Sequence, residues 1–552
     1  MSTTNSLAAS APFINATVSA SAGSGKTWLL ITRIVRLLLA GATPGSILAL
    51  TFTRKAASEM QIRLNERLYE LASCEDDELI KMLDEIQTEA SAENLQRARC
   101  LYEESLHSLN PVRLQTFHSF CQDILARFPL EADVPPGFEL LEDTSLLEQQ
   151  AWEELFTEAT KNSESPLTQA LDFLMQENNS VANLRSSLSS MLDHRSDWWA
   201  YTFDQTDPVG YAQAALRQQL QLDDNKDPIA HFFNDFSKAA LAKFAKLLAT
   251  HPTKTNVGHS DVVATLLAEA VFDLDTLNTV ASVFLTNSGQ PRARKASATQ
   301  EKKMSPEGQN QFLEIHERLS GQLIETLDYL KRQRTHAINQ AWYQTGQRFI
   351  KIFQRIKREL RMLDFTDLEW HCYQLLNTSD NALWVQYKVD QRIDHFLIDE
   401  FQDTNPTQWQ LLAPLFEEMA AGSTERWRTA FLVGDEKQSI YGFRRANPEL
   451  QSQASDWLAG HLGAEAAPLD SSWRSSPAII QFVNHVFQQD EVRALMPNFG
   501  EHDTHLKDLP GRVSIFPLCQ LDDDADEEEP DIYMRNPLLE PRREKINTLY
   551  QD

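Results

Sequence analysis

A glycine-rich segment near the N-terminus constrains the fold of this chain more than any other feature. The segment ASAGSGKT (20–27) follows the apolar run FINATVSA (13–20) and precedes a stretch with helical apolar periodicity over 26–40. A strand, a tight glycine turn and a helix in this order are typical of an α/β unit, whose crossovers keep neighbouring strands parallel. The segment therefore predicts a parallel sheet covered by helices.

The same alternation continues along the chain. Residues 46–53 (SILALTFT) predict a second strand, and 54–72 predict a helix. One face of that helix would be apolar, formed by Ala56, Met60, Leu64 and Leu68. Further apolar strands are predicted at 394–399 and 429–434, and we expect them in the same sheet.

Changes in sequence pattern predict several domains, as does the length of 552 residues. Over 131–355 the pattern is helical and rich in Gln and Leu, so we expect a large all-α insertion that begins at a VPPG joint. The α/β pattern over 1–130 resumes over 356–455. A new segment is expected over 456–552, with a helix near 476–489 and a strand over 513–518.

Composition narrows the surroundings and partners of the chain. Lys and Arg number 51 against 79 Asp and Glu, a formal net charge of −28. This balance weighs against nucleic-acid binding without excluding it, because a basic groove can coexist with an acidic exterior. The sequence has no apolar run of the roughly 18–20 residues that a membrane span needs, and no secretory signal pattern. The five cysteines lie far apart, so we expect no zinc site, no disulfide framework and a cytoplasmic location.

Two segments concentrate charge. The loop 288–306 is expected to be solvated, with contact to duplex DNA as the alternative. Its cations are Arg292, Arg294, Lys295, Lys302 and Lys303. The block 522–529 has seven acidic residues in eight, which predicts a solvated linker.

The glycine-rich segment also has the chemistry of a phosphate-binding loop. Backbone N–H groups in the turn can close around phosphate oxygens, and the helix start adds a partial positive charge. Lys26 would reach the β- and γ-phosphates, and the Thr27 hydroxyl would bind Mg²⁺. The residues expected around the phosphates are Ala20, Ser21, Ala22, Gly23, Ser24, Gly25, Lys26 and Thr27. The alternative, a glycine-rich turn with an accidental Lys-Thr, leaves the flanking strand and helix unexplained.

A pair of acids follows the strand predicted at 394–399. Asp399 would hold Mg²⁺, and Glu400 would orient or deprotonate the attacking water. The sequence continues as FQDTNPTQ (401–408), which is unusually polar after a buried strand.

Another polar run, VGDEKQSIYGFR, follows the strand at 429–434. Gln438 is placed where a neutral amide can sense the γ-phosphate. Tyr441 and Phe443 are placed to stack on nucleic-acid bases, with ordinary core packing as the alternative.

Seven segments in this order resemble the superfamily 1 DNA helicases of the UvrD/Rep type, most closely the AddA and RecB helicase subunits of recombination nucleases. They are ASAGSGKT (20–27), TFTRKAASEM (51–60), LQTFHSF (114–120), LDFTDL (363–368), LIDEFQDTNPTQ (397–408), VGDEKQSIYGFRRA (433–446) and LDSSWRSSP (469–477). The resemblance covers most of 13–130 and 360–490.

The resemblance implies a P-loop NTPase fold with a RecA-like parallel sheet. Residues 1–130 and 356–455 would form the first motor domain, 1A, interrupted by the helical insertion 131–355 at the position of the family's 1B subdomain. Residues 456–552 would be the start of a second RecA-like domain, 2A, ending in the acidic linker. The chain would then be the N-terminal portion of a longer motor.

The resemblance also implies roles for individual residues. Lys26, Thr27, Asp399, Glu400 and Gln438 would serve ATP and Mg²⁺, and Arg474 would reach the γ-phosphate from the facing domain. The single-stranded DNA track would include Phe52, Thr53, His118, Tyr441 and Phe443. Arg444 would couple that track to the nucleotide or hold a DNA phosphate, with a surface ion pair as the alternative.

The implied activity is a 3′→5′ ATP-dependent DNA helicase or translocase of recombinational double-strand-break repair. Its expected partners are single-stranded and duplex-end DNA and a second subunit of a helicase–nuclease complex. The alternatives are a truncated module that binds ATP and single-stranded DNA without translocating, and an unrelated P-loop NTPase.

The sequence departs from the family at three points. No Gln precedes Gln61, although the family reads adenine with a Gln upstream of the phosphate loop. Arg445 stands where the family often has Gly. Nothing after 490 resembles the last two family motifs, so we expect this chain to bind ATP, to hydrolyse it weakly and not to unwind DNA by itself.

Overall fold

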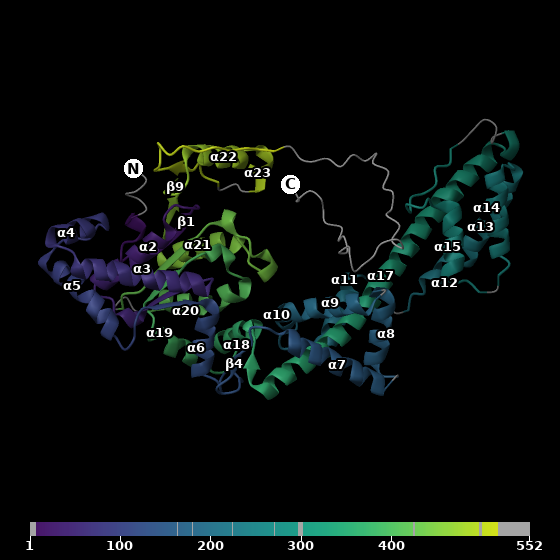
Figure 1. The fold of residues 1–552 in the computed structure, drawn as a ribbon. Coiled ribbons are helices and arrows are strands. Elements are labelled where there is room, and N and C mark those ends of the chain that lie inside the picture. The colour runs from purple at the N-terminus through teal and green to yellow at the C-terminus, as the bar shows by residue number, and fades with distance from the viewer. Residues whose placement is uncertain are drawn as a thin grey trace, which may run out of the picture. The chain divides into compact units, whose positions relative to one another are not determined.

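The computed structural model describes residues 7–516, apart from 163, 179, 224, 270, 296–301, 423–425 and 496–498. The chain forms two compact units, one made of Met1–Asp123 with Tyr373–Asp552 and the other of Ile124–Cys372 (Figure 1). These divisions differ from the sequence boundaries predicted at 130 and 355. Helices α6 (Phe117–Arg127) and α18 (Phe365–Asn377) run across them.

The first unit is built on a six-stranded sheet with the order β3-β2-β6-β7-β1-β8. The strands are β1 (Ala16–Ala20), β2 (Ile47–Thr51), β3 (Arg113–Thr116), β6 (His395–Ile398), β7 (Thr429–Gly434) and β8 (Glu465–Leu469). Every neighbouring pair is parallel. This confirms the predicted parallel sheet and the predicted strands at 13–20, 46–53, 394–399 and 429–434.

Helices cover both faces of this sheet. On one face, α2 (Lys26–Leu39), α3 (Arg54–Ser73), α4 (Asp76–Glu85) and α5 (Ala92–His107) form a core with the strands. On the other lie α20 (Pro406–Ala421) and α21 (Glu449–Leu462). Strand β6 shows the alternation, because Leu397 joins the first core whereas the ring of Phe396 lies 5.4 Å from that of Phe416 in α20.

Two details of the sequence prediction are wrong here. The buried face of α3 contains Ala57 rather than Ala56, together with the expected Met60, Leu64 and Leu68. The boundary at 456 falls inside α21, and β8 pairs with β1, because the weakly apolar segment EAAPL completes the sheet edge. Residues up to Leu469 therefore belong to the first sheet.

After β8 come the short strand β9 (Ser471–Ser472), α22 (Pro477–Phe487), α23 (Asp490–Leu495) and β10 (Asp503–Thr504), which pairs with β9. The strand predicted at 513–518 is not formed over 513–516, where Ile515 and Phe516 are exposed. Residues 517–518 and the acidic block 522–529 lie outside the described residues. Helix α19 (Ala382–Asp390) completes this unit.

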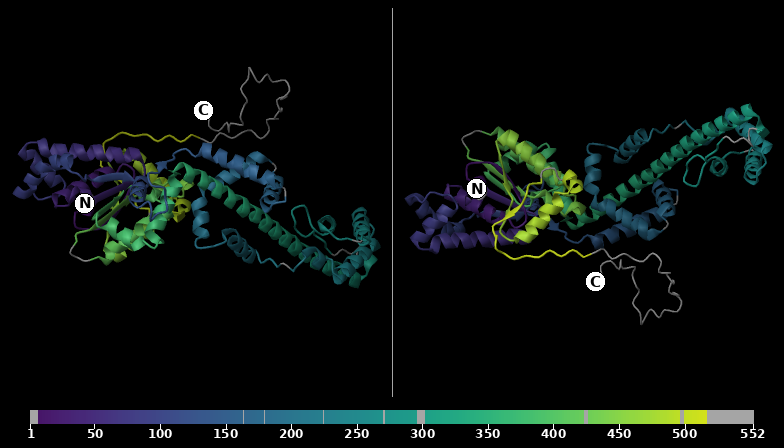
Figure 2. Two further views of the ribbon diagram at one scale, coloured as in Figure 1. Left: turned by 90° about the horizontal axis from the view of Figure 1, so that it is seen from below. Right: turned by 90° about the horizontal axis from the view of Figure 1, so that it is seen from above.

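The second unit is almost entirely helical. Its elements are α7 (Ser145–Lys161), α8 (Pro166–Asn178), α9 (Val181–Asp193), α10 (Arg195–Tyr201), α11 (Pro208–Gln219), α12 (Pro228–Phe232), α13 (Asp235–Thr250), α14 (Lys254–Leu266), α15 (Leu274–Phe284) and α17 (Pro306–Leu360), with a short pair of strands, β4 (Glu139–Leu140) and β5 (Met362–Leu363). Helix α17 has 55 residues, and the shorter helices pack along it in two cores (Figure 2).

The basic loop is not wholly solvated. The guanidinium of Arg294 lies over the rings of Phe244 and Phe312, at 5.7 Å and 5.5 Å from their centroids. Stacking of this cation on aromatic faces explains why the solvated-loop prediction is wrong for Arg294. Lys302 and Lys303 are exposed, and 296–301 lie outside the described residues. Within the described part of the chain, no helix is long and apolar enough to cross a membrane.

Candidate nucleotide-binding site

The predicted phosphate loop lies between β1 and α2, at the carboxyl edge of the sheet. Gly23 and Gly25 have φ values of 74° and 93°, a left-handed conformation that favours glycine. A side chain at Gly23 would also place its Cβ 2.6 Å from the Cβ of Arg474. The described first turn of α2 has no acidic residue and no side-chain cap. Its backbone N–H groups and dipole are therefore available to an anion.

The sheet order brings three polar segments together at this edge. Strand β7 lies between β6 and β1, so the loops that follow these strands are neighbours. Nζ of Lys26, after β1, lies 2.8 Å from Oε2 of Glu400, after β6, and 3.3 Å from Oε1 of Gln438, after β7. Three residues predicted separately for the nucleotide thus meet in one cluster.

Two residues that the sequence did not single out close this cluster into a ring. Nε2 of Gln402 donates to Oε2 of Glu400 at 2.6 Å, and its Oε1 accepts from the backbone N–H of Asp435 at 2.8 Å. Nε2 of Gln438 donates to Oδ2 of Asp435 at 2.6 Å. The only sequence signal for Gln402 was its place in the polar run after a buried strand.

Asp399 is buried beside this ring. Burial and the charge of Glu400 raise its pKa to about 7, while the charge of Lys26 opposes the shift. Its Oδ1 is buried without a hydrogen-bond partner among the described residues. A carboxylate oxygen left without a donor is suited to a cation, so Asp399 fits a Mg²⁺ ligand. Thr27 lies half-buried in the first turn of α2.

Asp403 shares this environment, although the sequence prediction omitted it. Burial and the charge of Glu400 raise the pKa of Asp403 to about 6. Its Oδ1 also has no hydrogen-bond partner in the described structure. Asp403 therefore adds a second buried carboxyl group near the edge where Asp399 and Glu400 end β6.

Arg474 lies next to the phosphate loop through its backbone. The N–H of Trp473 donates to the carbonyl oxygen of Gly23 at 2.8 Å, and the N–H of Arg474 donates to Oγ of Ser472 at 3.2 Å. The Arg474 side chain is exposed. The segment after β8 is thereby tied to the loop that Arg474 was predicted to serve.

A cavity of about 470 Å³ opens beside Ser24 and Gly25. Trp28 and Leu29 of α2 line it, and the ring of Trp473, stacked on His505 with centroids 3.8 Å apart, contributes another wall. The remaining lining residues are Leu7, Pro468, Leu469, Asp470 and Ser471. The sequence pattern did not predict this largely apolar cavity.

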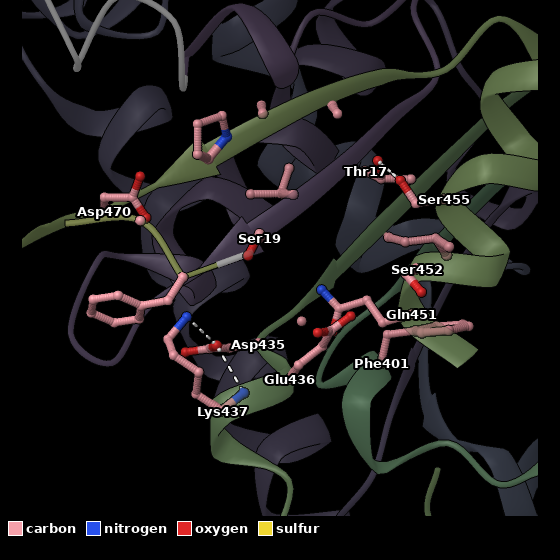
Figure 3. Close-up of a pocket in the computed structure, with 18 of the residues that line it drawn as sticks. Thr17, Ser19, Phe401, Asp435, Glu436, Lys437, Gln451, Ser452, Ser455 and Asp470 are labelled. Atoms are coloured by element: carbon pink, nitrogen blue, oxygen red, sulfur yellow. Dashed lines mark hydrogen bonds and ion pairs between the residues drawn. The ribbon is translucent and has the colours of Figure 1, made fainter. Parts of the chain in front are cut away.

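A second cavity, of about 350 Å³, lies against α21 and the strands β1, β7 and β8 (Figure 3). Asp435 and Lys437 form an ion pair at its edge, with Oδ1 and Nζ 2.7 Å apart. None of its lining residues belongs to the predicted phosphate loop, although Ser19 precedes that loop on β1. It is therefore separate from the Lys26 cluster.

Aromatic residues predicted for a DNA track meet at the end of β2. The ring centroids of Phe52 and Tyr441 lie 4.5 Å apart, and those of Tyr441 and Phe443 lie 5.8 Å apart. Phe443 is 75% exposed, which excludes core packing for that ring. Together the three rings form a partly exposed aromatic surface.

The other predicted track residues contribute differently. Oγ1 of Thr53 accepts from the N–H of Ala56 at 3.1 Å, so Thr53 caps α3. His118 is half-buried in the first turn of α6, which follows β3, the neighbour of β2. Arg444 ends the short 3₁₀ helix η4 (Gly442–Arg444), and its side chain is outside the described part. Arg445, which replaces a family glycine, has a left-handed φ of 68°.

A parallel sheet with a glycine loop after one strand and acidic residues after a neighbouring strand defines the class of phosphate-loop nucleotide-binding proteins. The chain belongs to the UvrD/REP helicase N-terminal domain family, whose sequence model matches residues 1–458.

Several AddA proteins, the helicase/nuclease subunits of ATP-dependent enzymes, are similar to most of this chain. The one from Lactobacillus johnsonii is 23% identical, over 88% of this chain and 39% of its own length. Those from Limosilactobacillus fermentum and Latilactobacillus sakei are 28% and 27% identical, over 86% and 88% of this chain. The matches cover 36% and 54% of those two relatives, so this chain spans about a third to a half of their length.

Proposed function

We propose that this chain is the nucleotide-binding part of an ATP-dependent DNA helicase or translocase that acts in recombinational double-strand-break repair. The observation that carries the proposal is the contact of Lys26 with both Glu400 and Gln438 at the start of α2. A cation, a carboxylate and a neutral amide then surround the place where the phosphate loop would hold a γ-phosphate. The family membership supports the same reaction class.

In the proposed reaction, Lys26 exchanges Glu400 for the β- and γ-phosphates of ATP. Glu400 is then released from its ion pair and can orient or deprotonate the attacking water. Gln438 reports the γ-phosphate to the loop after β7. Arg474 would add a planar cation for the charge that develops on the transferred phosphoryl group. Mg²⁺, held by Asp399 and Thr27, would neutralise phosphate charge.

The apolar cavity beside Gly25 supports a place for the nucleobase. A base bound there would lie between the indole of Trp28 and the stacked pair of Trp473 and His505. Aromatic side chains hold a base by stacking, which every base permits.

The aromatic surface of Phe52, Tyr441 and Phe443 supports single-stranded DNA as the second ligand. Stacking of bases on such rings is independent of sequence, as a translocating motor requires. Tyr441 and Phe443 are in the same loop as Gln438, three and five residues further on, so one loop would contact both ligands. We propose 3′→5′ movement, stimulation of hydrolysis by single-stranded DNA, and a second subunit in a helicase–nuclease complex.

Nucleotide hydrolysis with and without an oligothymidylate tests this proposal. We expect Mg²⁺-dependent ATP hydrolysis that the oligonucleotide stimulates, and we expect Lys26→Ala to lose it. Lys246→Ala, a change of an exposed lysine on α13, is the matched control and should retain it. Equal turnover in the wild type and Lys26→Ala would contradict the site assignment.

A further inference from the structure

Gln402 is a buried amide that contacts both the acid after β6 and the loop after β7. It is 1% exposed, and its side chain joins Oε2 of Glu400 to the backbone N–H of Asp435. We propose that Gln402 is a positioning residue: it holds Glu400 in the orientation for water attack and couples that orientation to the loop that carries the aromatic surface. This inference rests on the proposed function.

The orientation of the Gln402 amide is fixed by its two partners. A carboxylate only accepts hydrogen bonds, and a backbone N–H only donates them. The NH₂ group must therefore face Glu400, and the carbonyl oxygen must face Asp435. A flipped amide would lose both contacts and leave a buried N–H without an acceptor. Gln402 thus has one favourable arrangement.

The fold leaves space for this arrangement at Gly434. A Cβ on Gly434 would lie 2.9 Å from Oε1 of Gln402 and 2.5 Å from Oε1 of Gln451. Any larger residue at the end of β7 would press on the amide and shift it from Asp435. Glycine is needed here for the approach of a side chain, since its φ is not in the left-handed region.

The hydrogen bonds on Glu400 are unequally shared between its two oxygens. Oε2 accepts from both Lys26 and Gln402. The Glu400 side chain is 33% exposed, and its backbone has a left-handed φ of 51°. When Lys26 turns to the phosphates, Gln402 stays as the donor on Oε2. The carboxylate then keeps its direction, with Oε1 available to a water molecule.

The other end of Gln402 is tied to the loop that carries Gln438 and the aromatic rings. Asp435 begins this loop and accepts from Nε2 of Gln438. Oγ of Ser439 donates to the carbonyl oxygen of Gln402 at 3.2 Å. The N–H of Asn447, beyond the rings, donates to the carbonyl oxygen of Thr404 at 3.1 Å. A displacement of this loop by DNA would therefore be transmitted to Gln402 and Glu400.

Two substitutions test this role. Gln402→Met keeps the length of the side chain and removes both hydrogen bonds. Gln402→Glu keeps an acceptor for Asp435 and removes the donor to Glu400. We expect kcat for DNA-stimulated ATP hydrolysis to fall about tenfold or more in both, because a hydrogen bond to a charged group is lost. KM for ATP and the Kd for oligothymidylate should stay within about twofold, and stimulation by DNA should decline.

The control is Gln451→Met, which removes another amide beside Gly434 that does not contact Glu400 in the described structure. It should keep the wild-type kcat and DNA stimulation. An unchanged kcat in Gln402→Met, or equal losses of kcat, ATP binding and DNA binding in both Gln402 variants, would overturn the positioning role. Lys26→Ala is measured in parallel, and a wild type without hydrolysis overturns the proposed function and this inference together.

Discussion

Nζ of Lys26 lies 2.8 Å from Oε2 of Glu400, so the cation for the phosphates and the carboxylate for the attacking water form an ion pair. Each keeps the other from its proposed task. ATP must therefore separate them, and the entry of the γ-phosphate would itself release the base. This relationship makes hydrolysis depend on the presence of the substrate.

Gly23 is predicted to tolerate no side chain. In Gly23→Ala, the added Cβ would meet the Cβ of Arg474 at 2.6 Å, on a backbone with φ of 74°. We expect nucleotide affinity to fall at least about tenfold, because the loop must shift away from its phosphate-binding shape. Titration with a fluorescent ATP analogue measures this.

Gly258 in α14 is the matched control for that substitution. A Cβ on Gly258 would meet no atom within 4 Å. Gly258→Ala should leave nucleotide affinity unchanged and raise the free energy of unfolding by about 0.4–1 kcal/mol. Loss of affinity in both variants, or in neither, would contradict the account of the loop.

Asp399 predicts a pH dependence of stability. Its pKa is raised from 3.8 to about 7 by burial and by Glu400. Between these values the folded chain holds a proton that the unfolded chain has lost, so this group lowers the free energy of unfolding as pH rises from about 4 to about 7. Without Mg²⁺, Asp399→Asn should be roughly 2–4 kcal/mol more stable than the wild type at pH 8, and about equal at pH 4.

Urea denaturation at the two pH values checks this prediction. Asp456→Asn, an exposed position on α21, removes the same charge without a buried carboxyl and should show no such difference. Asp403, with its pKa raised to about 6, retains part of the slope in the Asp399 variant. A stability gain that is the same at pH 4 and pH 8 would contradict the burial argument.

Phe443 is predicted to bind DNA without stabilising the fold. Because the ring is 75% exposed, Phe443→Ala should leave the melting temperature nearly unchanged. Loss of stacking on one base should weaken oligothymidylate binding by about 1–3 kcal/mol. Fluorescence anisotropy measures this, with Phe516→Ala as the control, because Phe516 is 84% exposed and outside the aromatic surface. Equal effects of the two substitutions would exclude a specific role for Phe443.

A buried charge network explains a motif to which the sequence pattern assigned no role. Asp367 of LDFTDL is fully buried and contacts Arg195, Lys357 and Gln354, while Asp364 contacts the same two cations. Asp367→Ala would leave two buried cations with one carboxylate. We expect a loss of about 3–5 kcal/mol in the free energy of unfolding.

Asp328→Ala is the control for the buried network. Asp328 pairs with Arg332 on α17, and its side chain is 63% exposed. This substitution should cost about 0–1 kcal/mol, as exposed ion pairs do. Similar losses for Asp328→Ala and Asp367→Ala in chemical denaturation would contradict the assigned difference in burial.

The sequence predicted the parts of the site that follow from local pattern. Apolar runs identified β1, β2, β6 and β7, and a parallel sheet places their carboxyl ends at one edge. Lys26, Glu400 and Gln438 were therefore predictable as neighbours. The short segment EAAPL was not recognised as β8, because its membership in the sheet depends on β1 rather than on its own apolar content.

Contacts between distant segments were beyond the sequence pattern. Gln402 and Asp435 are 33 residues apart, and only the register of β6 and β7 brings the amide to the N–H. The cavity wall formed by Trp473 and His505 likewise needs β9 and β10 to pair. Arg294 appeared as one cation of a polar loop, although its guanidinium stacks on two buried rings.

The most direct test of the account is to measure ATP binding and ATP hydrolysis by Glu400→Gln in the presence of oligothymidylate. The substitution removes the counter-ion of Lys26 and the proposed base, and keeps the size of the side chain. We predict that Glu400→Gln binds Mg²⁺-ATP at least as tightly as the wild type while DNA-stimulated hydrolysis falls by on the order of 10²-fold or more. Hydrolysis at the wild-type rate in Glu400→Gln would contradict the central claim.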